Sequence, residues 1–373
     1  MSLYLVFLLA VAKASRNTLQ QKTEVDAGKP KLAGIIVKAS WKTLPQNTKV
    51  DAKKESKLEV TIKLPRNVTI PGVIAFGDSI VDSGNNNNLR TILKCNFPPY
   101  GQDFQGKFAT GRFTDGRVPS DFVAERLGIA KTIPAYLDPA LKGKDLLKGI
   151  NFASGGSGYD PLTAKIVRVV SLEDQLKYFQ EYKEKIKAIV GEEKAKFMVE
   201  NSLYLVLYNS TEYPDYLADM SSKFVKKLYG LGARRIAIFS AVPVGCLPSR
   251  RTLNGVKRKC SENLNKMALQ FNAKLSPGLV ALRKKSPGSK IVFVDVYDIL
   301  HNMIENPKKY GFEVANRGCG TGLFEVLILC NKINPFTCKN ASSHVFWDSY
   351  HPTEKAYQVI VDKLLGIYIP QLV

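Results

Sequence analysis

Short apolar runs alternate with longer stretches of helical periodicity from about Val68 to the C-terminus. Runs that are apolar throughout, with no regular polar alternation, are typical of strands buried on both faces of a sheet. Five runs are apolar throughout or nearly so, with a few polar residues in the second, fourth and fifth: residues 73–76, 149–153, 203–208, 235–241 and 290–296. Strands that alternate with helices predict a parallel sheet. Five of them predict an α/β, flavodoxin-like doubly wound fold.

The helices between these strands show apolar residues near a spacing of 3.6. The clearest begins at Ser171, which forms a capping-box pattern with Asp174, and ends at Gly191. A further helix is expected over residues 262–284, with a bend at Pro277 because proline cannot donate a helical hydrogen bond. The other predicted helices cover residues 119–128, 224–229 and 353–365.

The first 66 residues lack this alternation. Residues 3–12 are apolar and precede Ala12-Lys13-Ala14, a small-x-small pattern that predicts a secretory signal peptide over residues 1–14. An apolar chain start without a targeting role is the alternative. Residues 15–66 are rich in lysine, and we expect a basic, mostly disordered leader with a small β-hairpin beginning at residues 31–37. A single domain over residues 67–373 would follow.

The net charge of +21 suits acidic partners, such as an acidic polysaccharide or a phospholipid surface, but solubility together with a basic tail is the favoured explanation. The sequence contains no recognisable nucleic-acid-binding module, so nucleic acid is not an expected partner. No apolar run is long enough to predict a membrane span. Six cysteines favour an oxidising compartment, and Cys246–Cys260 is the expected local disulfide. No C-x-x-C pair occurs, so we expect no metal site. N-x-S/T sequons mark Asn67, Asn209 and Asn340 as glycosylation candidates.

A candidate nucleophile lies just beyond the first strand, because Ser79 follows two residues after Gly77. In a parallel sheet this position is at the carboxyl edge, where ligands bind. Serine catalysis needs a base and an orienting acid. Of the three histidines, His351 lies three residues after Asp348, which brings a carboxylate within reach of Nδ1 and leaves Nε2 for Ser79. His301 follows a strand and is predicted to be structural, whereas His344 lies in a loop beside a sequon and has no patterned partner.

Three sequence blocks resemble those of the plant GDSL esterase/lipase family, in the SGNH hydrolase superfamily. The first is Gly-Asp-Ser-x-x-Asp-x-Gly-Asn-Asn-Asn at residues 77–87. The second is the glycine-rich segment 149–161, and the last is Trp-Asp-x-x-His-Pro-Thr at residues 347–353. The resemblance implies the SGNH hydrolase fold with Ser79 as nucleophile, His351 as general base and acid, and Asp348 as its orienting carboxylate.

The resemblance also implies an oxyanion hole. In the superfamily it is formed by the N–H of the serine, here Ser79, by a glycine N–H of the second block and by an asparagine side chain of another block. Gly156 is the expected glycine donor, with Gly155 next. In the block after residue 208 this sequence departs from the family: Asn209 stands at the glycine position and Thr211 at the asparagine position. Thr211 is therefore the candidate third donor.

Further motifs shared with the family lie at residues 95–101, 111–117, 243–248, 310–312 and 318–322. The leader before Asn67 has no expected counterpart. The resemblance implies a secreted carboxylic ester hydrolase of the plant apoplast or cell wall, acting in lipid catabolism through a serine acyl-enzyme. The expected substrates are esters of a lipid or of an acylated polysaccharide, and no metal or cofactor is expected. The alternative is a catalytically impaired relative that binds acylated glycan or a cell-wall polymer, favoured by the altered block and the basic charge.

Overall fold

The computed structural model describes residues 36–41, 58–208, 213–320, 325, 329–330 and 337–373. Its centre is a five-stranded sheet in the order β4-β3-β5-β6-β7, in which all neighbouring strands are parallel. The strands are β3 (Val73–Gly77), β4 (Gly149–Asn151), β5 (Leu203–Leu207), β6 (Arg235–Phe239) and β7 (Lys290–Val294). The predicted α/β doubly wound fold is therefore confirmed.

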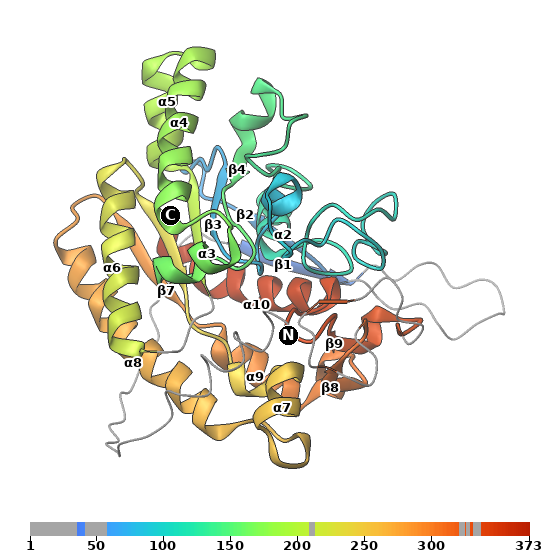
Figure 1. The fold of residues 1–373 in the computed structure, drawn as a ribbon. Helices are drawn as coiled ribbons and strands as arrows, with labels where there is room; N and C mark the ends of the chain where they lie inside the picture. The colour runs from blue at the N-terminus through green and yellow to red at the C-terminus, as the bar shows by residue number, and fades with distance from the viewer. Residues whose placement is uncertain (1–35, 42–57, 209–212, 321–324, 326–328, 331–336) are drawn as a thin grey trace. The chain divides into compact units, whose positions relative to one another are not determined.

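The strand order divides the helices between two faces of the sheet. The chain passes from β3 to β4 in one direction and from β4 across to β5, β6 and β7 in the other. Since such crossovers are right-handed, the first lies on one face and the later ones on the opposite face. α2 (Pro119–Arg126) contacts α10 (Glu354–Leu372), while α6 (Pro214–Gly230) lies beside α8 (Glu262–Lys284) (Figure 1). The direction reverses between β3 and β5, where ligands bind in folds of this class.

The centre of the sheet is filled by aromatic side chains. All residues of β3 and β5 are buried, which explains their uninterrupted apolar sequences. The Phe76 ring lies 5.2 Å from that of Phe152, 5.7 Å from that of Phe179 and 5.6 Å from that of Phe224. The segment just after β4 and the helices that carry Phe179 and Phe224 thus pack on one side chain of β3, three residues before Ser79.

The five predicted helices are present, with differences at their ends. α4 (Leu172–Val190) begins after Ser171, whose Oγ accepts a hydrogen bond from the backbone N–H of Asp174 at 3.2 Å. α8 has the predicted bounds and contains Pro277. α6 starts ten residues earlier than the predicted 224, at Pro214, and α10 continues past residue 365 to Leu372. Among the residues that the structure describes, four α-helices were not predicted: α3 (Pro161–Val167), α5 (Glu192–Asn201), α7 (Pro248–Asn254) and α9 (Tyr297–Glu305).

Two strands lie inside the segment predicted to be a mostly disordered leader. β1 (Ile36–Trp41) pairs with β2 (Leu58–Lys63) in antiparallel register. β2 contacts α2 and α10, and Ile62 is buried. The apolar residues of β2 alternate with polar ones, a pattern that suits a strand with one covered face, so this part of the prediction is corrected. The predicted signal peptide and residues 31–35 lie outside the described residues.

Two disulfides cross-link the segments that follow the sheet strands. The predicted Cys246–Cys260 bond is present, and a second joins Cys319 to Cys338. Cys95 and Cys330 are buried free thiols. Two short strands, β8 (Val314–Gly318) and β9 (His344–Phe346), pair beside the second disulfide. Of the helices that the structure describes, none has both the length and the apolar character needed to cross a membrane.

Candidate active site

Ser79 is presented by a sharp turn at the carboxyl end of β3. At Gly77 a Cβ atom would lie 2.3 Å from the carbonyl oxygen of Leu207, so only glycine allows β3 to turn this close to β5. The backbone N–H of Asp78 donates to the same oxygen at 3.1 Å. The carboxylate of Asp78 accepts the N–H of Ile80 at 2.9 Å, which closes the turn around Ser79.

The structure brings the three predicted catalytic residues together. The Oγ of Ser79 lies 2.7 Å from Nε2 of His351, and Nδ1 of His351 lies 2.8 Å from Oδ2 and 2.9 Å from Oδ1 of Asp348. Because a carboxylate can only accept, Nδ1 carries the proton and Nε2 is left to accept from the serine hydroxyl. Asp348 and His351 are fully buried, whereas Ser79 is half-buried and can be reached from solvent. This geometry suits proton transfer between Ser79 and His351.

The carboxylate of Asp348 is fixed by further donors. It accepts the backbone N–H groups of Tyr350 at 2.8 Å and His351 at 2.6 Å, and the hydroxyl of Tyr100 at 2.8 Å. Burial, with the nearby charge of Asp348 as the next cause, raises the pKa of Tyr100 well above its usual value, so the hydroxyl stays protonated and can donate. The same hydroxyl oxygen accepts the N–H of Cys330 at 2.9 Å. Tyr100 belongs to the motif at residues 95–101, whose role the sequence did not reveal.

A second motif, at residues 111–117, holds the loop that carries His351. The hydroxyl of Thr114 donates to the carbonyl oxygen of Pro352 at 3.0 Å. The carboxylate of Asp115 accepts the N–H of Glu354, the first residue of α10, at 2.8 Å. The ring of Phe113 lies 5.3 Å from the imidazole of His351. The motif therefore fixes the residues that follow His351 and packs an aromatic ring near its imidazole.

The polar residues of the first block tie it to the glycine-rich second block. Asp82 accepts the N–H groups of Gly84 and Asn85 at 2.8 Å each and that of Gly155 at 2.9 Å. The side-chain amide of Asn86 donates to the carbonyl oxygen of Gly155 at 2.8 Å. The N–H of Gly155 is thus already engaged. Gly156, the first choice from the sequence, remains the candidate oxyanion donor.

Gly156 has a positive φ of 88°, which favours glycine. A Cβ atom there would also lie 2.4 Å from Cδ1 of Leu93. Asn209 and Thr211, the residues expected in the altered block, lie outside the described residues. Among the glycosylation candidates, Asn67 and Asn340 are exposed, and Asn209 again falls outside that range.

Gln175 is a site residue that the sequence analysis missed. From α4 its Oε1 accepts the N–H of Gly77 at 3.1 Å and the hydroxyl of Tyr208 at 2.8 Å, while its Nε2 donates to the Gly77 carbonyl at 3.0 Å. The fully buried amide thus binds both backbone polar groups of Gly77 and holds the end of β3 next to the turn that carries Ser79. A signal existed, because Gln175 is three residues after Leu172 and four before Phe179, and therefore lies on the apolar face of the helix.

The other histidines lie in different surroundings. His301 stacks on Tyr297, with ring centroids 5.7 Å apart, as expected of a structural residue. His344 lies close enough to the sulfur atoms of Cys319 and Cys338 to suggest a metal-binding group. These two sulfurs are bonded to each other, however, and a disulfide does not offer thiolate ligands.

The burial of Asp82 predicts a pH dependence of stability. Burial raises its pKa to about 6, although three backbone N–H groups and the charge of Arg112 act in the opposite direction. Because the folded state then binds the proton more tightly than the unfolded state, whose reference value is 3.8, folding is favoured at low pH. As the pH rises from about 4 to above 6, this residue should lower the free energy of unfolding by about 3 kcal/mol.

Urea unfolding of the wild type and Asp82→Asn at both ends of this pH range measures the effect. The variant should lose less stability over the range than the wild type does, by the amount given above. Asp138→Asn, at an exposed carboxylate that accepts one backbone N–H, is the matched control and should retain the wild-type dependence. Parallel pH profiles for the wild type and Asp82→Asn would contradict the prediction.

Comparison with known proteins identifies the family to which this chain belongs. The family model described as GDSL-like lipase/acylhydrolase matches residues 73–364. The chain belongs to this family. Among its relatives in Arabidopsis thaliana, GDSL esterase/lipase At5g42170 is 66% identical, over 99% of both chains. GDSL esterase/lipase At1g59030 is 58% identical over 82% of this chain and 93% of its own, and GDSL esterase/lipase EXL3 is 54% identical over 84% and 91%.

The predicted resemblance to GDSL esterases/lipases is therefore confirmed. One expectation is corrected, because the alignment with At5g42170 extends over nearly the whole chain, so the residues before Asn67 do have a counterpart in one relative. The family model covers residues 73–364, the part of the chain that contains the sheet and the Ser79 site.

Proposed function

We propose that this GDSL family member is a carboxylic ester hydrolase that acts through an acyl-enzyme on Ser79. The observation that carries the proposal is the continuous set of hydrogen bonds from Ser79 Oγ through His351 to Asp348. Their donor–acceptor distances of 2.7 and 2.8 Å are within the range needed for a nucleophile, its base and the orienting acid.

The hydrogen-bond geometry supports the following proton transfers. Nε2 of His351 takes the proton of Ser79 as Oγ attacks the ester carbonyl carbon, and the imidazolium then gives it to the leaving alkoxide oxygen. In the second half-reaction His351 takes a proton from water, the hydroxide attacks the acyl carbon, and the proton returns to Ser79 as the acid is released. The negative charge of Asp348 stabilises the imidazolium in both steps.

The backbone N–H groups of Ser79 and Gly156 are the proposed donors to the oxyanion, with Thr211 as a third donor. Replacement of the family's asparagine by threonine leaves the chemistry in place but weakens one donor. Removal of one such donor typically lowers kcat by about 10²–10³-fold. We therefore expect activity lower than that of a relative with an asparagine at this position.

The proposed setting is extracellular, in the plant apoplast or cell wall, with a lipid or acylated polysaccharide as the ester substrate and lipid catabolism as the role. Two disulfides fit an oxidising compartment. The exposed sequon residues Asn67 and Asn340 would then be open to glycosylation, together with Asn209. The net charge of +21 would favour adhesion to an acidic wall polymer.

Hydrolysis of p-nitrophenyl butyrate by the purified full chain, followed by nitrophenolate release and by acid titration, tests the function. Turnover above the heat-inactivated control, unchanged by EDTA, is expected. The second candidate is the impaired relative that binds acylated glycan, which the altered block at Asn209 and Thr211 favours. Absence of turnover together with binding to acetylated polysaccharide would support that candidate and overturn the first.

A further inference from the structure

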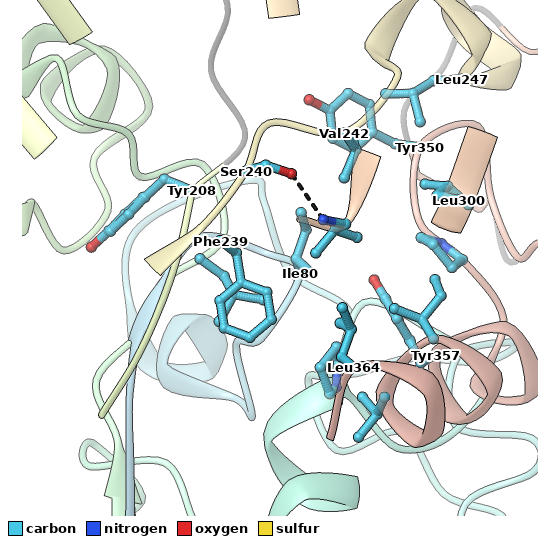
Figure 2. Close-up of a pocket in the computed structure, with 16 residues that line it drawn as sticks. Ile80, Tyr208, Phe239, Ser240, Val242, Leu247, Leu300, Tyr350, Tyr357 and Leu364 are labelled. Atoms are coloured by element: carbon cyan, nitrogen blue, oxygen red, sulfur yellow. Dashed lines mark hydrogen bonds between the residues drawn. The ribbon is translucent and has the colours of Figure 1, made fainter. Parts of the chain in front are cut away.

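A small apolar pocket begins beside the nucleophile. It lies between the carboxyl ends of β5 and β6 and helix α10, and its lining includes Ile80, Phe239, Leu300, Pro352 and Leu364 (Figure 2). Ile80 follows Ser79 directly and Pro352 follows His351, so the lining includes the residue after each member of the hydrogen-bonded pair Ser79–His351. A pocket in this place suits the acyl part of an ester bound at Ser79.

The size of the pocket limits its occupant. Its cavity volume is about 50 Å³. One water-sized group needs about 10–15 Å³ by this measure, which leaves room for about three to five non-hydrogen atoms. The side chains around it are almost all aliphatic or aromatic, so a short carbon chain is the suitable occupant.

The polar groups in the lining differ in whether the protein satisfies them. Ser240 Oγ accepts the N–H groups of Val296 at 2.9 Å and Tyr297 at 3.1 Å, and the hydroxyl of Tyr208 donates to Gln175. The hydroxyl of Tyr357, in contrast, has no hydrogen-bond partner within the described part of the chain. The Tyr357 residue is only 3% exposed.

The hydroxyl of Tyr357 is aimed into the pocket. Figure 2 shows it extending from α10 toward Ile80. Burial raises the pKa of Tyr357 well above its usual value, and the charges of Asp348, Asp78 and Asp115 contribute in the same direction. The group therefore stays protonated and offers one donor to a ligand atom close to the ester.

We propose that this pocket binds a short acyl chain and that Tyr357 donates a hydrogen bond to an oxygen on that chain, so that the preferred substrates are esters of short hydroxy- or oxo-carboxylic acids. The inference rests on the proposed ester hydrolase function. A buried hydroxyl without a partner is unfavourable in the free protein, and a ligand oxygen that accepts from it removes that penalty. A site with such a donor discriminates against the analogue that lacks the oxygen.

The test compares p-nitrophenyl 3-hydroxybutyrate with p-nitrophenyl 3-methylbutyrate, in which a methyl group replaces the hydroxyl. In the wild type kcat/KM should favour the hydroxy ester by about tenfold or more. Tyr357→Phe should abolish this preference by slowing the hydroxy ester, while leaving the methyl ester unchanged. Because the hydroxyl has no protein partner, Tyr357→Phe should also keep or raise the melting temperature.

Tyr182→Phe is the matched control, since this buried tyrosine donates to the carbonyl oxygen of Leu146 at 3.0 Å. It should lower the melting temperature and keep the wild-type ratio of the two esters. If the wild type and Tyr357→Phe show the same ratio, the role of Tyr357 is wrong although the proposed function stands.

A binding measurement separates the two proposals if neither ester is hydrolysed. Calorimetry with ethyl 3-hydroxybutyrate and ethyl 3-methylbutyrate on the full chain carrying Ser79→Ala does not depend on turnover. Tighter binding of the hydroxy ester that is lost in the Ser79→Ala/Tyr357→Phe chain supports the pocket assignment. Equal binding of both esters, or no binding, overturns it.

Discussion

Replacing Ser79 with alanine is expected to lower kcat for p-nitrophenyl butyrate by about 10⁵–10⁶-fold. The variant keeps the backbone N–H at this position and the pocket beside it, but no atom remains to form the acyl-enzyme. KM should change little, because the Ser79 hydroxyl is only one of the groups that the ester contacts before the chemical step. Fixed-time assays at high enzyme concentration, with the wild type as reference, measure the loss in kcat.

Ser83→Ala is the control for this experiment. Ser83 lies in the same sequence block and is 5% exposed, and its hydroxyl has no hydrogen-bond partner among residues that the structure describes. Its removal should leave kcat unchanged. Retention of activity in Ser79→Ala, or equal losses in the two variants, would contradict the assignment of the nucleophile.

Asp348→Asn is expected to lower kcat by about 10⁴-fold, as loss of the orienting carboxylate does in serine hydrolases with this arrangement. The carboxylate accepts from Nδ1 of His351 and thereby leaves Nε2 unprotonated toward Ser79. The asparagine amide would donate to Nδ1 and place the proton on Nε2, which could then no longer accept from the serine. KM should again stay close to that of the wild type.

The matched control is Asp174→Asn, at a partly exposed carboxylate in the first turn of α4. This substitution also converts a carboxylate to an amide, but at a residue far from His351 in the sequence. It should keep the wild-type kcat. Circular dichroism of Asp348→Asn should match the wild type, since the asparagine retains an oxygen for the N–H of Tyr350. Wild-type kcat in folded Asp348→Asn would show that this carboxylate does not orient His351.

The local features of the fold were predictable from sequence. The strands β3 and β5 are buried on both faces, so that their apolar runs mark them without ambiguity. Asp348 and His351 are three residues apart, so their contact within one loop follows from the sequence spacing. That this pair lies near Ser79 was expected because Ser79 is at the carboxyl edge of the sheet and because the motifs resemble those of the family. The early part of α6 was missed because its first turns adjoin the segment whose motif is altered.

Contacts between distant residues were not predictable in the same way. Tyr100 donates to Asp348 across 248 positions and Gln175 clamps Gly77 across 98, and periodicity carries no information about such pairs. Tyr357 appeared only as one position on the predicted last helix, where an aromatic side chain normally serves the core. Its significance depends on the pocket that β5, β6 and α10 form together, which only the assembled structure reveals.

Labelling with a fluorophosphonate probe tests the central claim most directly, because such probes react covalently with activated serine hydroxyls. Mass spectrometry of the intact full chain should show the addition of one probe, and peptide mapping should place it on Ser79. Neither Ser79→Ala nor heat-inactivated protein should be labelled, whereas Ser83→Ala should be labelled like the wild type. A wild-type chain that stays unlabelled, or that carries the probe on another serine, would contradict the account.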